Sequence, residues 1–170
     1  MKKSGIFRKK WFIIFFITVL LEVFVFNIRF WDSLGNREVT DYKTTWNGIS
    51  REGDKIIINE EEGYLEIDGF NTHISNIFLD VSAGEADSVV NVNIQADDAT
   101  SSSAKYTVDC GTTQIVNSVE ATKYLRLHLR EESTFLRIYF KVSEGTVLNL
   151  NEILLNCVQP FHFVWYRAFI

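Results

Sequence analysis

The chain has 170 residues with a single proline, and its 17 Lys and Arg residues against 22 Asp and Glu residues give a formal net charge of −5. Residues 1–10 hold five of the basic residues and no acidic residue, so the remainder has a formal charge of −10 and is not expected to bind nucleic acid, which requires a basic surface. Roughly 120 residues lie between the first apolar segment and Pro160, enough for one ordinary domain with its own core.

Residues 11–31 form the first predicted element, an apolar helix that crosses a membrane. At about 1.5 Å per residue the segment is about 31 Å long, close to the hydrocarbon thickness of a bilayer. The basic segment 1–10 predicts a cytoplasmic N-terminus, and therefore an extracytoplasmic domain after a single pass through the cell membrane. No small-residue cleavage site of a secretory signal follows the apolar run, so we expect the helix to remain as an anchor.

Glu22 lies inside this apolar run. A carboxylate at that depth costs about 2.5–3.5 kcal/mol on insertion scales, so we expect it to be protonated or to face a protein group. One interpretation is that Glu22, with Thr18 one helical turn earlier, contacts a polar group of another transmembrane helix. The other is that a single neutralised Glu is tolerated in so apolar a segment.

Residues 32–45 are expected to form a linker and residues 46–158 an all-β domain. Short runs rich in Ile, Val, Tyr and Phe recur there, separated by Gly, Asn, Asp and Ser. Such runs, with no helix between them, predict an antiparallel β-sandwich of the jelly-roll type. The expected strands are residues 55–58, 63–67, 74–81, 88–95, 105–110, 113–119, 123–130, 135–142 and 146–158.

Two of these strands, residues 123–130 and 135–142, are predicted to form a hairpin whose turn is residues 131–134. This register places apolar side chains opposite one another on one face of both strands, and a slip of one residue would destroy the match. The other face of the hairpin is aromatic and basic. The last strand changes its apolar phase near Asn151 and Glu152, which predicts a bulge or bend there.

Cys110 and Cys157 are the two cysteines of the chain. Each falls on the apolar phase of its strand, so both side chains are expected to point inward. An extracytoplasmic location permits a disulfide between them, but sequence spacing does not establish the distance that a disulfide requires. The alternative is two buried free thiols that pack as small apolar groups.

The final segment, residues 159–170, is rich in aromatic residues. Aromatic side chains are frequent where a chain meets the membrane surface, so this segment is expected to be membrane-proximal. It then either begins a second span of a longer protein or rests its aromatic side chains on the bilayer surface. The alternative is that its aromatic side chains pack back onto the sandwich.

The run LRIYFKV, the turn SEGT and the final strand LNLNEILLN resemble the closing strands of galactose-binding-like jelly rolls, the fold of many carbohydrate-binding modules. The resemblance covers residues 45–158. It implies carbohydrate binding, and it implies a structural calcium ion held by loop carboxylates. The anchor, the domain and the aromatic exit are also similar to the N-terminal region of large multi-spanning bacterial membrane proteins, including glycosyltransferase-like ones, in which Asp32 or Asp41 would belong to a catalytic region.

Signatures of catalysis are absent from the sequence, which contains no nucleophile elbow, P-loop, zinc-binding HExxH or dinucleotide fingerprint. We therefore expect no enzyme active site and no cofactor. Carbohydrate-binding modules stack exposed aromatic rings on sugars and place polar groups nearby, and this resemblance selects the candidate ligand-binding residues. They are Trp46, Tyr64, Phe70, Tyr124, Arg126, His128, Arg137 and Tyr139.

Two functions remain open from the sequence. The first is an interaction module that recognises an envelope glycan or an anionic polymer. The second is a structural subdomain that binds no ligand and packs against other parts of a larger membrane protein.

Overall fold

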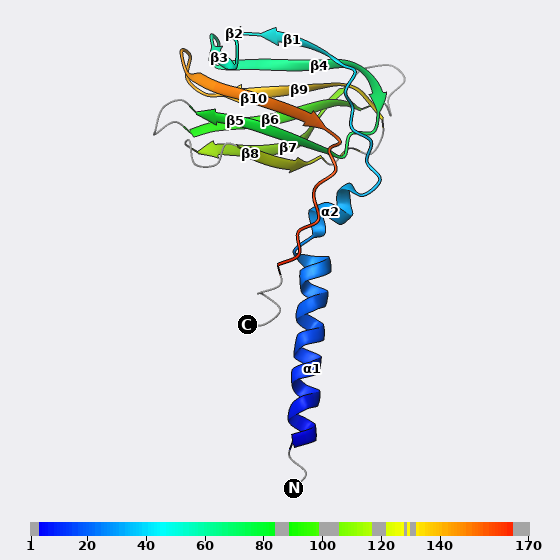
Figure 1. Ribbon diagram of the computed structural model, residues 1–170. Helices are drawn as coiled ribbons and strands as arrows, with labels where there is room; N and C mark the ends of the chain where they lie inside the picture. Colours follow the sequence, from blue (N-terminus) through cyan, green and yellow to red (C-terminus); the bar gives the residue numbers. More distant parts are fainter. Residues whose placement is uncertain are drawn as a thin grey trace. The chain divides into compact units, whose positions relative to one another are not determined.

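The computed structural model describes residues 4–83, 89–98, 106–116, 122–127, 129 and 132–164 (Figure 1). The chain divides into two compact units. The helical unit consists of Met1–Gly35 and Val158–Ile170, and the sandwich unit consists of Asn36–Cys157.

The helical unit contains three consecutive helical elements. The α-helix α1 covers Ser4–Leu20, a π-helix η1 covers Leu21–Val25, and the short α-helix α2 covers Ile28–Ser33. Within the described residues, no single helix combines the length and the apolar character needed to cross a lipid bilayer.

The prediction of one continuous helix over residues 11–31 is wrong, and Asn27 explains the break. The Phe26 N–H donates to the Leu21 carbonyl five residues earlier (3.0 Å), which leaves the Glu22 carbonyl without its α-helical donor. The Asn27 amide nitrogen donates to that carbonyl instead (2.7 Å). A polar side chain that competes for backbone groups in this way interrupts α-helical geometry, and Asn27 itself has non-helical φ and ψ of −109° and 24°.

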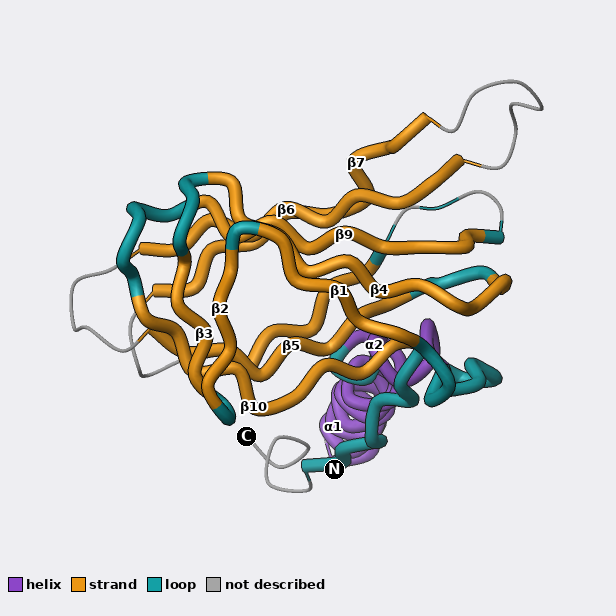
Figure 2. Tube along the Cα trace, turned by 90° about the horizontal axis from the view of Figure 1, so that it is seen from above, coloured by secondary structure: helices purple, strands orange, loops and turns teal. Residues whose placement is uncertain are grey.

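The sandwich unit confirms the predicted antiparallel β-sandwich. In the part of the chain that the structure describes, ten strands form two five-stranded antiparallel sheets (Figures 1 and 2). The first sheet has the order β1-β4-β9-β6-β7 and the second has the order β2-β3-β10-β5-β8. The strands are β1 (Lys43–Asn47), β2 (Ile49–Glu52), β3 (Lys55–Ile58), β4 (Glu62–Thr72), β5 (Asn76–Ala83), β6 (Val89–Asp98), β7 (Tyr106–Val116), β8 (Thr122–Arg126), β9 (Ser133–Lys141) and β10 (Val147–Leu155).

The predicted hairpin between residues 123–130 and 135–142 is wrong, because its two strands belong to different sheets. β8 pairs with β5 in the second sheet, whereas β9 lies between β4 and β6 in the first. The apolar phase of β9 is as predicted, since Leu136, Ile138 and Phe140 are fully buried. β4 and β6 carry the same alternation, so the phase of β9 fits them equally well and does not select a partner.

Register shifts occur at three places in the described strand pairings, and two of them bear on the sequence predictions. β10 shifts register between Leu150 and Glu152, which confirms the predicted irregularity near Asn151 and Glu152. A second shift lies between Ile94 and Gln95 of β6, opposite Gly111 and Asp109 of β7. This bulge lets β7 run as one strand where the sequence predicts two, residues 105–110 and 113–119.

The core of the sandwich lies between the inner faces of the two sheets and consists mainly of Ile, Leu and Val side chains. Cys110 and Cys157 are both buried and both free, so the structure contains two buried thiols and no disulfide between them. The Cys110 Sγ donates to the Ile94 carbonyl (3.1 Å), and burial raises the pKa of the Cys110 thiol to about 12. Such a thiol is unreactive at neutral pH.

Candidate functional site

The outer face of the first sheet gathers aromatic, amide and charged side chains. Alternate residues of β4, β9 and β6 point away from the core, and the pairing places Tyr64 beside Tyr139 and Tyr139 beside Asn93. The next row joins Glu66, Arg137 and Gln95 in the same way. We call this surface the amide–aromatic face; its residues are Asn47, Tyr64, Glu66, Asn91, Asn93, Gln95, Asp109, Gln114, Arg137, Tyr139 and Lys141.

Tyr64 and Tyr139 form an aromatic pair at the middle of the face. Their ring centroids are 5.0 Å apart with an interplanar angle of 43°, and both residues are half-buried. The Asn47 amide nitrogen donates to the Tyr64 hydroxyl (2.8 Å). Asn47 therefore holds the Tyr64 ring from one side and Tyr139 contacts it from the other. Part of the surface of both rings stays accessible.

Arg137 lies against this aromatic pair. Its guanidinium carbon is 5.3 Å from the centroid of the Tyr64 ring and 5.1 Å from that of Phe135, within the range of cation–π attraction. Its Nε donates to Glu66 Oε2 (2.6 Å), and this hydrogen bond raises the pKa of the Arg137 guanidinium above its usual value. The aromatic contacts and the carboxylate together fix the direction of the side chain.

The β6 and β7 side of the face consists of amides. Asp109 Oδ1 accepts hydrogen bonds from the amide nitrogens of Gln95 (2.9 Å) and Asn93 (3.3 Å). The Gln114 amide nitrogen donates to Asn91 Oδ1 (2.9 Å). Asn91, Asn93, Gln114 and Lys141 line a depression of about 430 Å³ beside the aromatic pair.

This arrangement suits a ligand that has both apolar surface and hydroxyl groups. The aromatic rings offer flat apolar surface, and the amides and carboxylates offer donors and acceptors in positions fixed by mutual hydrogen bonds. Adjacent strands are about 4.8 Å apart, so the row from β4 to β7 spans about 14 Å. The face is long enough for an oligomeric ligand.

The structure brings together three of the eight predicted ligand-binding residues. Tyr64, Arg137 and Tyr139 share the amide–aromatic face. Tyr124 and Arg126 belong to β8 of the second sheet, where they pair with Phe78 and Asn76.

The other three predicted residues lie elsewhere. Phe70 is only 8% exposed and belongs to the core. Trp46 pairs with the buried Leu65, so it points away from the amide–aromatic face. The guanidinium carbon of Arg51 lies 5.6 Å from the centroid of the Trp46 ring. Trp46 lines a separate pocket of about 330 Å³. His128 lies outside the described residues.

The amides of the face are not among the ligand-binding residues predicted from the sequence. Asn91, Asn93 and Gln95 alternate with buried Val92 and Ile94, so the sequence places all three on the outer side of one strand. That alternation is a usable signal, but an exposed amide is ordinary on any strand. Only the pairing with β9 places these amides beside the aromatic pair.

The described residues contain no cluster of three or more His, Cys, Asp or Glu side chains placed to hold a metal ion. The structural calcium ion implied by the sequence resemblance stays a prediction.

No family model matches the chain, and no curated protein matches it. Among solved structures, the chain is similar to carbohydrate-binding modules of family 29. One mutant module is 14% identical, with 71% of this chain and 87% of that chain covered and a TM-score of 0.48. A mutant complexed with mannohexaose is 16% identical (71% and 85% covered, TM-score 0.48), and a mutant complexed with cellulohexaose is 16% identical (68% and 80% covered, TM-score 0.48).

Proposed function

We propose that the amide–aromatic face binds carbohydrate. The observation that carries the proposal is the half-buried pair Tyr64 and Tyr139 beside a depression lined by amides. Sugar rings have an apolar face that stacks on aromatic rings and a rim of hydroxyls that exchange hydrogen bonds with amides and carboxylates. Both kinds of contact lie within one row of the sheet.

The charges of the face favour an uncharged glycan over an anionic polymer. Arg137 is bound to Glu66 (2.6 Å), and Lys141 Nζ lies 3.9 Å from Glu62 Oε1. Both cations of the face thus have a carboxylate neighbour, and an anionic ligand would meet little net positive charge. Neutral oligosaccharides need no such charge, because they bind by stacking and hydrogen bonding.

Isothermal titration calorimetry of the full chain in nanodiscs tests this function. The titrants are neutral oligosaccharides of cell-envelope type and, separately, an anionic envelope polymer. Tyr139→Ala is expected to weaken binding about tenfold, because one stacked ring contributes about 1–1.5 kcal/mol. Tyr124→Ala is the matched control on the second sheet and should leave affinity unchanged.

The calorimetric outcomes discriminate between the candidate functions. Binding of neutral oligosaccharides that Tyr139→Ala weakens supports the proposal. Binding of the anionic polymer alone would overturn the preference for a neutral glycan. No heat with any titrant would favour the structural subdomain.

The proposed location of the chain is a lipid membrane, to which the apolar surface of α1 attaches it. Seven consecutive residues, Trp11 to Ile17, are each at least 40% exposed. Seven helical residues turn through almost two full circles, so apolar side chains surround the helix on all sides. A protein groove would cover one stripe, whereas lipid contacts the whole circumference.

The side of attachment follows from the charges next to this surface. Lys9 and Lys10 are exposed immediately before Trp11. Basic residues at that end favour the cytoplasmic side for the N-terminus. Because no single described helix can cross the bilayer, a sandwich on the other side would require α1, η1 and α2 to cross it together.

Flotation of the full chain with phosphatidylcholine vesicles tests the attachment: the wild type should float, and Ile14→Lys with Ile17→Lys should stay in the soluble fraction. A wild-type chain that does not float overturns the attachment.

A further inference from the structure

The helical unit buries three polar side chains among its described residues: Glu22 (0% exposed), Asn27 (3%) and Ser33 (0%). Each accepts a backbone N–H from the segment 159–164. The three hydrogen bonds run from Gln159 N to Ser33 Oγ (2.8 Å), from His162 N to Asn27 Oδ1 (2.7 Å) and from Val164 N to Glu22 Oε1 (2.9 Å). We call these three side chains the clasp.

The partners of the clasp follow one another in the opposite direction along the chain. Ser33, Asn27 and Glu22 lie in order toward the N-terminus, whereas their donors Gln159, His162 and Val164 lie in order toward the C-terminus. The segment 159–164 therefore runs antiparallel to the helical elements. It contains neither helix nor strand.

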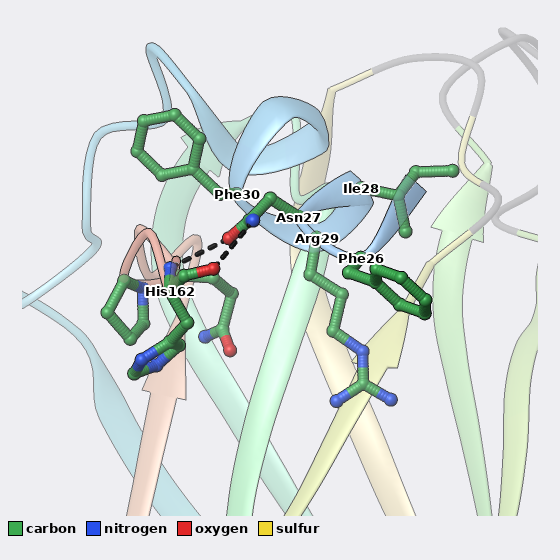
Figure 3. Close-up of a pocket in the computed structure, with 8 residues that line it drawn as sticks. Phe26, Asn27, Ile28, Arg29, Phe30 and His162 are labelled. Carbon is green, nitrogen blue, oxygen red and sulfur yellow. Dashed lines mark hydrogen bonds between the residues drawn. The ribbon is translucent and has the colours of Figure 1, made fainter. Parts of the chain in front are cut away.

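Asn27 binds the segment at two points, as Figure 3 shows. Its Oδ1 accepts the His162 N–H, and its Nδ2 donates to the His162 carbonyl (2.7 Å). The same Nδ2 donates to the Glu22 carbonyl, which the π-helix leaves without its usual donor. The break in the helix and the capture of the segment thus depend on one side chain.

The exposed side chains of the segment 159–164 are Pro160, Phe161 and His162. Phe161 is 41% exposed, and its ring packs edge-on against Phe30 with centroids 5.2 Å apart. The segment therefore turns backbone N–H groups toward the clasp, and its exposed side chains are two apolar groups and one histidine.

We infer that the clasp is a binding site for extended backbone, whose occupant is the segment 159–164, and that it allows this non-helical segment to lie in lipid beside the helical elements. The inference rests on the lipid attachment proposed above. Backbone groups in lipid are costly unless the protein satisfies them, and an extended segment cannot satisfy its own N–H groups. Glu22 supplies such an acceptor from within the apolar run, and in this structure Glu22 Oε1 binds the N–H of Val164 of the same chain.

Amide hydrogen exchange of the full chain in phosphatidylcholine nanodiscs tests the clasp, because each variant should affect one end of the segment. Glu22→Met removes the acceptor at Val164 and should speed exchange there about tenfold, with Gln159 changing less than about twofold. Ser33→Ala should give the reverse pattern. Glu22→Gln keeps an acceptor oxygen and should leave both ends within about twofold of the wild type.

The outcomes separate the clasp from the lipid attachment. Opposite-end effects of Glu22→Met and Ser33→Ala, with unchanged exchange in the sandwich, support the clasp and cannot result from general unfolding. Unchanged exchange at Val164 in Glu22→Met, or equal acceleration at both ends, overturns it. A wild-type chain that does not enter nanodiscs overturns the lipid attachment, whereas a chain that enters them with the segment unprotected overturns the clasp alone.

Discussion

The sandwich unit and the helical unit distribute their side chains in opposite ways. The sandwich buries Ile, Leu and Val between its sheets and presents tyrosines, amides and charges on its outer face. The helical unit exposes Trp11 to Ile17 and buries Glu22, Asn27 and Ser33. The same physical rules produce both patterns if water surrounds the sandwich unit and lipid surrounds the helical unit. Each unit then exposes the side chains that interact favourably with the medium around it.

The buried polar groups of the helical unit also have a different origin from those of a sheet. A sandwich satisfies its backbone by strand pairing, so its side chains are free to be apolar inside. In the helical unit, the extended segment 159–164 makes no strand pair, and the side chains of the clasp replace the missing strand. The burial of polar side chains in the helical unit is therefore the consequence of placing an extended segment beside a helix.

Phe140→Ala against Phe12→Ala gives the largest expected difference between the units. Phe140 is fully buried in the sandwich, so its loss should lower the free energy of unfolding by about 3–5 kcal/mol. Phe12 is 70% exposed, so its loss should cost less than about 0.5 kcal/mol. Urea denaturation followed by circular dichroism of the β structure measures both, and similar costs for the two variants would contradict the contrast.

Asn27→Leu against Asn91→Leu applies the same contrast to polar residues. Asn27 is buried and makes three hydrogen bonds, so an apolar replacement should destabilise the helical unit by about 1–3 kcal/mol. Asn91 is exposed on the sandwich, and its replacement should change stability by less than about 0.5 kcal/mol. Thermal unfolding in nanodiscs measures the pair; a larger cost for Asn91 would reverse the proposed assignment of interior and exterior.

Asp97 is one of four buried polar side chains among the described residues of the sandwich, and it is the carboxylate among them. It joins the end of β6 to the start of β9. It accepts hydrogen bonds from the N–H groups of Thr134 (2.8 Å) and Phe135 (3.2 Å) and from the Thr134 hydroxyl. Burial alone would raise the pKa of Asp97, but these hydrogen bonds outweigh burial and lower it below its usual value. A carboxylate whose pKa is lowered by folding stabilises the fold above the unfolded-state pKa of about 3.9.

The stabilisation from Asp97 should therefore be complete near neutral pH and decline as the pH falls below about 4 toward the folded-state pKa. Asp97→Asn should cost about 1–2 kcal/mol at pH 7 and less at pH 3, where the wild type has begun to lose the same interaction. Urea titrations at both pH values test this prediction. Equal costs at the two pH values would show that the charge of Asp97 does not contribute.

The sequence predicts the strands of the sandwich better than their partners. Alternation reports which side of a strand is buried, so β3 and the bulge at Leu150 and Glu152 follow from it. Alternation does not distinguish β8 from β4 or β6 as the neighbour of β9, because all of them carry the same phase. β1 and β2 escape prediction because their residues are mostly exposed and lack the alternation.

The functional residues divide in the same way. Tyr64, Arg137 and Tyr139 are predictable as exposed aromatic and basic residues of two strands, whereas their meeting with Asn93 and Gln95 requires the order of the sheet. The clasp depends on contacts between residues more than one hundred positions apart, which no local pattern reports. Glu22 is conspicuous in the sequence, but its partner at Val164 is a backbone group and leaves no trace in residue type.

Arg137 and Lys141 of the amide–aromatic face each form an ion pair with a carboxylate of β4, and these two pairs give the smallest expected effects. They show how far solvent exposure weakens an ion pair. Lys141 Nζ and Glu62 Oε1 are 3.9 Å apart, and the Glu62 side chain is 76% exposed, so Glu62→Gln should change the free energy of unfolding by less than about 0.5 kcal/mol. Arg137 and Glu66 are 2.6 Å apart with side chains 32% and 24% exposed, and Glu66→Gln should cost about 1 kcal/mol because it loosens the arginine that lies against Tyr64. Urea denaturation at low and at high salt measures both variants. High salt should reduce the loss of unfolding free energy in Glu66→Gln only slightly, because a partly buried ion pair is screened less than an exposed one. If both variants lost the same free energy and high salt abolished both losses, Arg137 would be held no more firmly than Lys141.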